Sequence, residues 1–180
     1  MAPRRLLPAA VLAIGIGLAP TQAFAFEGQW HLGGGLGVGW FADGATSPGP
    51  VLDLHGAYGL SDYFDVKLEA LGALHSRHDR GLGLYGASAG IAYKVDVIRW
   101  IPYVGVQFGY YRLSGTDLPG ELRPNELGMS VDLGMDYAVS RSFGIGVELR
   151  YHGFLSDPLA SLGDAPYFSG VLRAEYRWGW

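Results

Sequence analysis

The segment 168–180 alternates between apolar and polar positions over its whole length. Because successive side chains of a β-strand point to opposite faces, each of the two sets lies on one side of a sheet. One face is apolar and rich in aromatic residues, and the other carries three charges. This combination is typical of a strand that separates lipid from the polar interior of a barrel. The apolar face consists of Phe168, Gly170, Leu172, Ala174, Tyr176, Trp178 and Trp180, and the charges opposite are Arg173, Glu175 and Arg177.

The same two-residue period recurs in earlier segments of the chain. A helical fold is disfavoured, because the chain has 29 glycines and each costs about 1 kcal/mol in a helix relative to alanine. The 11 tyrosines suit strands instead. The sequence therefore predicts an all-β fold, an eight-stranded antiparallel up-and-down transmembrane β-barrel. The earlier strands are expected near 29–41, 52–60, 64–75, 85–94, 103–111, 127–137 and 145–152.

The predicted connections alternate in length. Those after the first, third, fifth and seventh strands are mostly long, at about 43–50, 76–81, 114–125 and 153–166. Those after the second, fourth and sixth are short, at about 60–63, 97–102 and 140–142. Short periplasmic turns and longer extracellular loops are the asymmetry of an outer-membrane barrel.

A soluble eight-stranded barrel would show the same alternation with its faces exchanged, the apolar side surrounding a ligand or a packed core. Two features favour the membrane form. Aromatic residues gather near the strand ends, as in the girdles of membrane barrels, and the opposite face is crowded with glycines and with charges of both signs, which suits a narrow interior. The predicted girdle includes Trp30, Trp40, Tyr151, Phe168 and Trp178.

The N-terminal segment reads as a secretory signal peptide. Arg4 and Arg5 precede an apolar run over 6–18, and Ala23-Phe24-Ala25 resembles a small-residue cleavage site. We expect 1–25 to be removed after Ala25, which leaves 26–180 as a single barrel domain. No later segment has the ~20 unbroken apolar residues of a spanning helix. The mature chain would be acidic, which argues against a nucleic-acid partner.

The chain resembles the small outer-membrane β-barrel proteins of Gram-negative bacteria, OmpA-type in architecture. The resemblance implies an outer-membrane location, contact with membrane lipid and lipopolysaccharide, and a monomeric barrel. It also implies insertion by the barrel-assembly machinery, which reads a terminal aromatic residue, here Trp180, although phenylalanine is the commoner residue in that family. The resemblance rests on three segments: the turn 60–64 (LSDYF), the segment 100–105 (WIPYVG) and the C-terminal 176–180 (YRWGW).

Charged residues at inward-facing positions form the predicted lumen network. An eight-stranded barrel is just wide enough for side chains to fill it, and buried charges must pair or be hydrated. The network is expected to close the lumen, and a gated narrow conduit for small solutes or ions is the alternative. The predicted members are Asp53, Lys67, Glu69, Asp132, Glu148, Arg150, Arg173, Glu175 and Arg177.

Two sequence motifs suggest a bound ligand, but each lacks part of the context that such a site requires. The segment 81–86 spells G-x-G-x-x-G, but the dinucleotide interpretation needs a helix to follow, and here a strand pattern follows. His75, His78 and Asp79 could ligate a metal ion, yet a clear further ligand is missing. We therefore expect no cofactor and no metal.

A lipid A deacylase is the enzymatic alternative, since some eight-stranded barrels carry a histidine–serine pair on the lipid-facing surface. His75 with Ser76 and His152 with Ser156 do not have the expected spacing, and both histidines fall on the inner face. The basic loop 76–80 could contact lipopolysaccharide phosphates through its arginines. The sequence thus favours a non-enzymatic barrel with a structural or surface-interaction role, with a narrow pore or a lipid A-modifying enzyme as alternatives.

Overall fold

The computed structural model describes residues 26–115, 125–155 and 165–179. The predicted signal peptide with Ala25, and the C-terminal Trp180, lie outside the described residues. In the described part no helix is long and apolar enough to cross a membrane. The strands are β1 (Trp30–Phe41), β2 (Thr46–Ser47), β3 (Gly49–Gly59), β4 (Phe64–Arg77), β5 (Arg80–Lys94), β6 (Trp100–Gly115), β7 (Asn125–Ala138), β8 (Phe143–Phe154) and β9 (Tyr167–Trp178).

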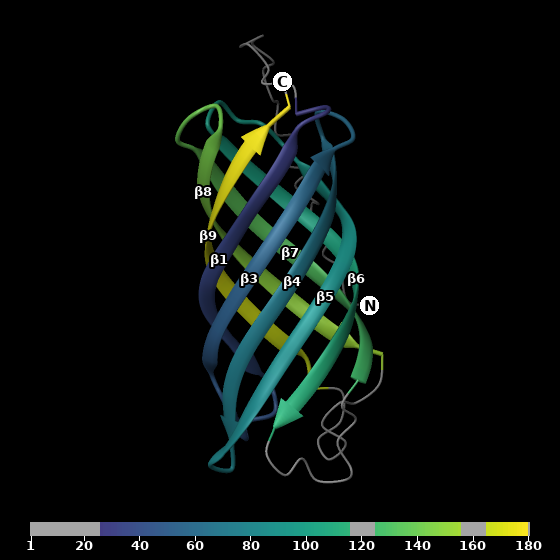
Figure 1. Ribbon diagram of the computed structural model, residues 1–180, viewed down its shortest axis with the longest axis vertical. Coiled ribbons are helices and arrows are strands. Elements are labelled where there is room, and N and C mark those ends of the chain that lie inside the picture. Colours follow the sequence, from purple (N-terminus) through teal and green to yellow (C-terminus); the bar gives the residue numbers. More distant parts are fainter. Residues whose placement is uncertain (1–25, 116–124, 156–164, 180) are drawn as a thin grey trace, which may run out of the picture.

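The strands form one closed antiparallel barrel (Figure 1). Consecutive long strands pair with one another, β1 pairs with β9, and the β4–β5 pairing completes the ring. The two-residue β2 pairs with the far end of β4, beyond the part that β3 covers, so the wall has eight strands. The strands run diagonally around the barrel, as closure requires. The predicted eight-stranded up-and-down barrel is confirmed.

The two faces of the wall have opposite chemistry. In β7 exposed and buried residues alternate almost throughout, and after Asn125 the exposed set is apolar. Leu36 and Leu172 on the outer face are 67 % and 71 % exposed, whereas Gln107 and Asp132 on the inner face are fully buried. Water would penalise such an outer face, and lipid accommodates it. The burial pattern is therefore that of a barrel with its apolar side turned outward.

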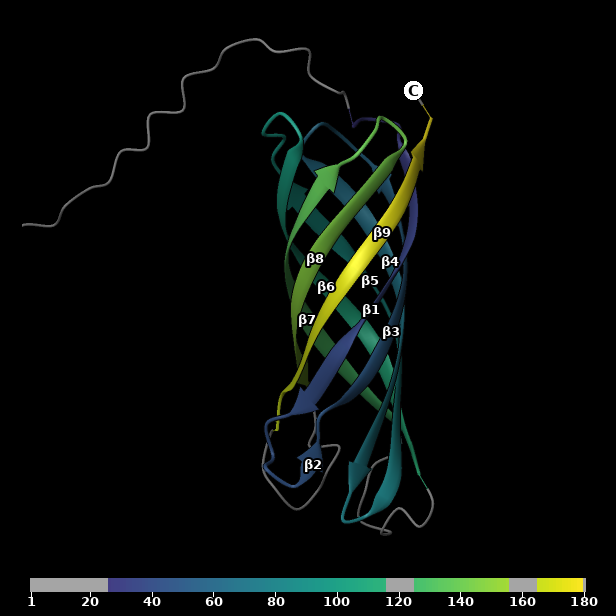
Figure 2. The same ribbon diagram turned by 90° about the vertical axis from the view of Figure 1, so that its left-hand side faces the viewer.

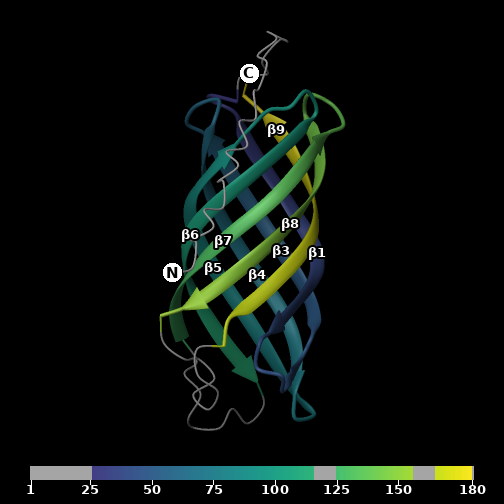
Figure 3. The same cartoon turned by 180° about the vertical axis from the view of Figure 1, so that it is seen from behind.

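The connections at the two ends of the barrel differ. The β3–β4, β5–β6 and β7–β8 turns lie at the end where the C-terminus is marked, and the β4–β5 turn and the segment between β1 and β3 lie at the opposite end (Figures 1 and 2). Because outer-membrane barrels carry short turns on the periplasmic side, we take the end with the C-terminus as periplasmic. Figure 3 shows β6–β9 running between the same two ends on the far wall.

One predicted loop is wrong. Instead of a polar loop over 76–81, β4 and β5 pair as far as Arg77 and Arg80 and leave a two-residue turn. Both turn residues have positive φ, 48° for His78 and 62° for Asp79. A two-residue hairpin with positive φ at both positions matches the twist of its strands, and histidine and aspartate tolerate this region better than most residues. The polar residues thus belong to strands that continue beyond the apolar band.

The β1–β2 connection is ordered by Asp43. Its carboxylate accepts hydrogen bonds from the backbone N–H groups of Ala45 (3.1 Å) and Thr46 (2.9 Å) and from the Thr46 hydroxyl (2.7 Å). Burial alone would raise the pKa of this carboxyl, but the hydrogen bonds and the nearby Arg77 charge hold the pKa of Asp43 below its ordinary value. The extracellular loop is therefore anchored at the rim by an ionised aspartate.

The residues of the predicted girdle lie on the outer face near both ends of the strands. At the periplasmic end the Trp30 ring packs on Tyr58, with centroids 4.7 Å apart, and Trp178 lies beside Tyr176. At the extracellular end Phe168 lies between Trp40 (5.6 Å) and Tyr151 (5.4 Å). The structure thus brings these side chains into two groups, as the two interfaces of a bilayer require.

Candidate functional site: the charged interior

The inner face of the barrel is the candidate site. All nine predicted network residues point inward, and none is more than 8 % exposed. They come from five of the eight wall strands, because each strand contributes every second residue. By strand, the residues are Asp53 on β3, Lys67 and Glu69 on β4, Asp132 on β7, Glu148 and Arg150 on β8, and Arg173, Glu175 and Arg177 on β9.

Two ion pairs cross the full width of the lumen. Lys67 Nζ lies 3.2 Å from Glu148 and 2.5 Å from Asp132, and Arg150 pairs with Glu69. The strands β4 and β8 face each other across the ring, because three strands separate them on either side. Since Lys67 and Glu69 both reach β8, the network occupies the centre of the bore.

Arg173 connects most of the remaining members. Its guanidinium donates to Glu148 (2.8 Å), to Glu175 (2.9 Å) and to the Tyr103 hydroxyl. Its Nη2 also lies 2.8 Å from a ring nitrogen of His55. Below it, Arg177 donates to Glu175 over 2.6 Å. A guanidinium supplies five donors in a rigid plane, which suits it to hold several acceptors at once.

Small residues on the inner wall leave room for this network. A methyl group added at Gly33 would meet the His55 ring, and one added at Gly105 would meet the Asp132 carboxylate at 2.5 Å. A methyl group added at Gly134 would collide with the Tyr103 ring. The inward glycines noted in the sequence therefore have a steric role, since the large polar side chains lie flat across them.

A second, simpler pair lies toward the periplasmic mouth. Lys94 on β5 donates to Asp65 on β4, with 2.8 Å between Nζ and Oδ2. The ammonium also lies 4.0 Å from the centre of the Phe26 ring. Alternation places both charged residues inside, but strand pattern alone does not reveal that they meet, because Asp65 is opposite Ala92 rather than Lys94.

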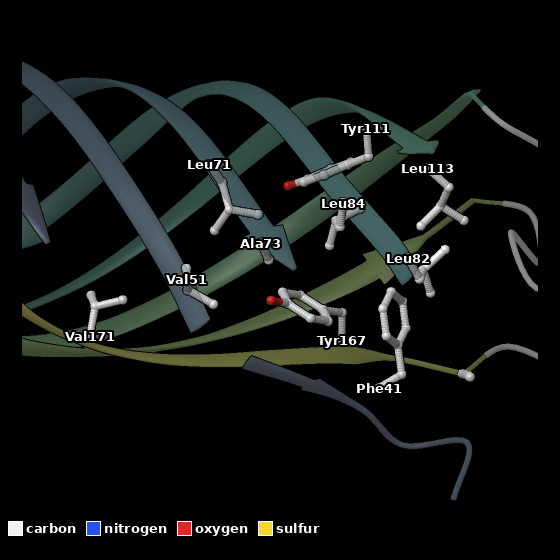
Figure 4. Close-up of a cluster of buried hydrophobic side chains, with 11 residues drawn as sticks. Phe41, Val51, Leu71, Ala73, Leu82, Leu84, Tyr111, Leu113, Tyr167 and Val171 are labelled. Atoms are coloured by element: carbon white, nitrogen blue, oxygen red, sulfur yellow. The ribbon is translucent and has the colours of Figure 1, made fainter. Parts of the chain in front are cut away.

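An apolar layer at the extracellular end of the lumen was not predicted (Figure 4). The Phe41 ring packs on Tyr167 with centroids 4.8 Å apart, and Tyr111 packs edge-on against His152. The sequence signal was available, since 70–74 and 82–85 are apolar or small at consecutive positions, on both faces of the strand. The layer comprises Phe41, Val51, Leu71, Ala73, Leu82, Leu84, Tyr111, Leu113, Ala165, Tyr167 and Val171.

Two cavities lie between these layers and the periplasm. A cavity of about 30 Å³ lies beside Lys94, Tyr103 and Arg173, which has room for about two water molecules. It adjoins a vestibule of about 110 Å³ at the periplasmic rim, which Gln29 and Arg177 help to line.

Comparison with known proteins agrees with this architecture. The outer membrane protein beta-barrel domain family matches residues 9–166. This chain belongs to that family. The family and the barrel place it in the outer membrane of a Gram-negative bacterium, as the sequence predicts. No curated protein matches the chain significantly.

Solved structures of outer-membrane barrels share the fold of this family member. Neisserial surface protein A superposes with a TM-score of 0.62 at 16% identity, covering 84% of this chain and 97% of its own. The attachment invasion locus protein Ail of Yersinia pestis gives 0.57 at 16% identity, covering 84% and 99%. OprG of Pseudomonas aeruginosa gives 0.56 at 16% identity, covering 86% and 97%. At these identities the likeness concerns the fold alone.

The glycine-rich motif considered for nucleotide binding lies in the barrel wall. The glycine-rich segment 81–86 is part of β5, which continues as a strand to Lys94. Within the three described stretches of chain, no histidine, aspartate and glutamate side chains form a group able to hold a metal ion. His75 faces inward while Ser76 is exposed, so this pair lies on opposite faces of β4. Ser156 lies outside the described residues.

The Lys94–Asp65 pair offers a test of how the buried charges depend on each other. Lys94→Met and Asp65→Leu each leave one buried charge without its partner, whereas the double variant leaves neither. We expect the double variant to lose less stability than the two single variants lose together. The difference, the interaction energy, should be about 1–3 kcal/mol. Urea unfolding of the four proteins in lipid vesicles gives this energy. Additive losses would contradict a direct pair.

Proposed function

We propose that this outer-membrane barrel is sealed and has a structural or surface-interaction role rather than a transport or enzymatic one. The observation that carries the proposal is the pair of contacts from β4 to β8, Lys67 with Glu148 and Glu69 with Arg150. The interior of an eight-stranded ring is just wide enough for side chains to fill, so contacts across its widest span support a closed lumen.

The two interior layers support the same conclusion independently. The apolar layer around Phe41 and Tyr167 lies toward the extracellular end, and the charged network lies below it. An ion crossing the lumen would have to shed water in the first layer, which is costly in apolar surroundings. It would then have to displace paired charges in the second. A narrow conduit would need both layers to move.

The enzymatic alternative is disfavoured by burial. His152 lies 3.4 Å from the Ser169 hydroxyl, but both residues are at most 3 % exposed and lie inside the barrel. A lipid substrate approaches from the outer face, so a nucleophile on the inner face cannot reach it. Assays on lipid A are therefore expected to show no deacylation.

Planar-bilayer recording tests the seal. The purified protein is expected to give no steady conductance in symmetric salt, because the side chains of the charged network fill the bore. Steady unitary currents from the wild-type barrel would contradict the proposal that the lumen is sealed. The variant Glu69→Ala/Arg150→Ala provides a matched comparison, since it deletes the contacts that Glu69 and Arg150 make across the lumen and leaves the formal charge of the network unchanged. Brief openings in this variant, absent from the wild type, are the expected result.

A further inference from the structure

The outer face of the barrel carries a groove across β4, β5, β6 and β7. It is shallow and wide open to the surroundings, with a volume of about 580 Å³. The floor is low because Ala87 and Ala89 expose only methyl groups, and larger apolar side chains stand on either side. These strands are neighbours in the ring: β4 and β5 run at the front of the barrel in Figure 1, and β6 and β7 continue around to the wall seen in Figure 3. The outward side chains that line it are Leu68, Ala87, Ala89, Phe108, Tyr110 and Leu127.

A single charge stands above this groove. Among the described strand residues, Arg112 is the one charged residue at an outward-facing position of the wall. Arginine facing lipid costs about 2–4 kcal/mol at the midplane but only about 0–1 kcal/mol near the interfaces. An exposed arginine on this face is therefore tolerable only at the level of the head groups.

The strand register places Arg112 at that level and directly over the groove. It follows Tyr110 on the same face of β6, about 6–7 Å further toward the extracellular end. Its neighbour across the ladder is Tyr85, and the next pair down is Ala87 with Tyr110. Along the membrane normal, the charge comes first, then an interfacial tyrosine, then the apolar groove. A lipid has the same order, with its head group above its acyl chain.

We propose that this surface is a binding site for one phosphorylated outer-leaflet lipid of the lipid A type. The acyl chain lies in the groove over Ala87 and Ala89, and a head-group phosphate accepts hydrogen bonds from the Arg112 guanidinium. Arginine binds phosphate through two parallel hydrogen bonds. Free phosphate would contact the arginine alone, whereas a phosphorylated lipid also fills the apolar groove. The inference uses the outer-membrane location of the barrel and does not depend on whether the lumen is sealed.

Native mass spectrometry of the purified barrel tests this site. The protein is released from micelles doped with diphosphorylated lipid A, with dephosphorylated lipid A or with phosphatidylcholine. The wild type is expected to retain one molecule of diphosphorylated lipid A, and about fivefold less of either other lipid, since one arginine near a charged surface is worth about 1 kcal/mol. Equal retention of the three lipids would mean ordinary solvation by lipid and would overturn the proposal.

Two variants separate the two halves of the site. Arg112→Gln should lower retention of diphosphorylated lipid A about fivefold and leave the dephosphorylated form unchanged. Ala87→Leu fills the floor and should lower retention of both. Both substitutions are on the lipid-facing surface and leave the interior packing intact, which heat-modifiable migration on gels can verify.

Matched substitutions elsewhere serve as controls. Ala174→Leu changes an outward alanine on β9, on the opposite wall of the ring from β5. Arg99→Gln removes an exposed arginine at the periplasmic end. Both should retain lipid as the wild type does. If the controls lose as much lipid as the site variants, or if Ala87→Leu instead releases a second copy of the barrel, the groove is not a lipid site.

Discussion

Replacing Arg173 with methionine is expected to destabilise the barrel by about 3–5 kcal/mol, the cost of leaving buried partners of an ion pair uncompensated. Arg173 donates to Glu148 and Glu175 and contacts Tyr103 and His55. The methionine fills much of the same volume, so the loss reports on charge rather than on a cavity. Since folded proteins are stable by only about 5–15 kcal/mol, this single change would remove a large share of the total.

Urea titration in lipid vesicles, followed by tryptophan fluorescence, measures this loss. Arg173→Lys keeps the charge but loses the planar donor set, and we expect an intermediate loss. Arg99→Gln, at an exposed periplasmic position, should change the free energy of unfolding by less than about 0.5 kcal/mol. An Arg173→Met barrel as stable as the wild type would show that the carboxylates around it are protonated or hydrated, and the network would then be no electrostatic plug.

The second large effect concerns the outer face. Leu172→Arg, near the middle of β9, should cost about 2–4 kcal/mol, the penalty for arginine at the bilayer midplane. Leu172 is 71 % exposed, and in a soluble barrel a substitution at so exposed a position would be nearly neutral. The same titration in vesicles therefore distinguishes lipid from water as the solvent of this face.

Leu155 is the matched control for this experiment. It is also 71 % exposed, but it follows the end of β8 at the extracellular rim. Leu155→Arg should change the free energy of unfolding by at most about 1 kcal/mol, because the cost of arginine falls toward the interface. Equal losses at the two positions would contradict a depth-dependent environment and hence a membrane-spanning wall.

The wall of the barrel was predictable because a strand repeats every two residues. The alternation in 127–137 and 168–180 assigns each side chain to a face, and the structure agrees over 127–137 and 168–178. The connection after β4 was mispredicted for a local reason. The polarity of 76–81 predicts a loop, but a strand also becomes polar outside the apolar band. The His78–Asp79 turn lacks the glycine or asparagine that marks most tight hairpins.

The interior was predictable only as a set of residues. Strand period shows that Lys67, Glu148 and Arg173 point inward, but it carries no information on which of them meet, because partners across the lumen are unrelated in sequence position and in ladder register. The apolar layer near Phe41 and Tyr167 was missed for a related reason, since consecutive apolar residues remove the alternation on which the assignment depends.

The sequence by itself determined that this chain is a membrane barrel, which faces of its strands meet lipid, and that charges of both signs share the inner face. These are local properties, set by side-chain direction along each strand. The tertiary structure alone decided that β4 reaches β8 across the bore, that Arg173 meets Glu148, Tyr103 and His55, and that Arg112 stands above an apolar groove. Those contacts depend on ring closure and on the register between strands, which bring together residues that no local pattern connects.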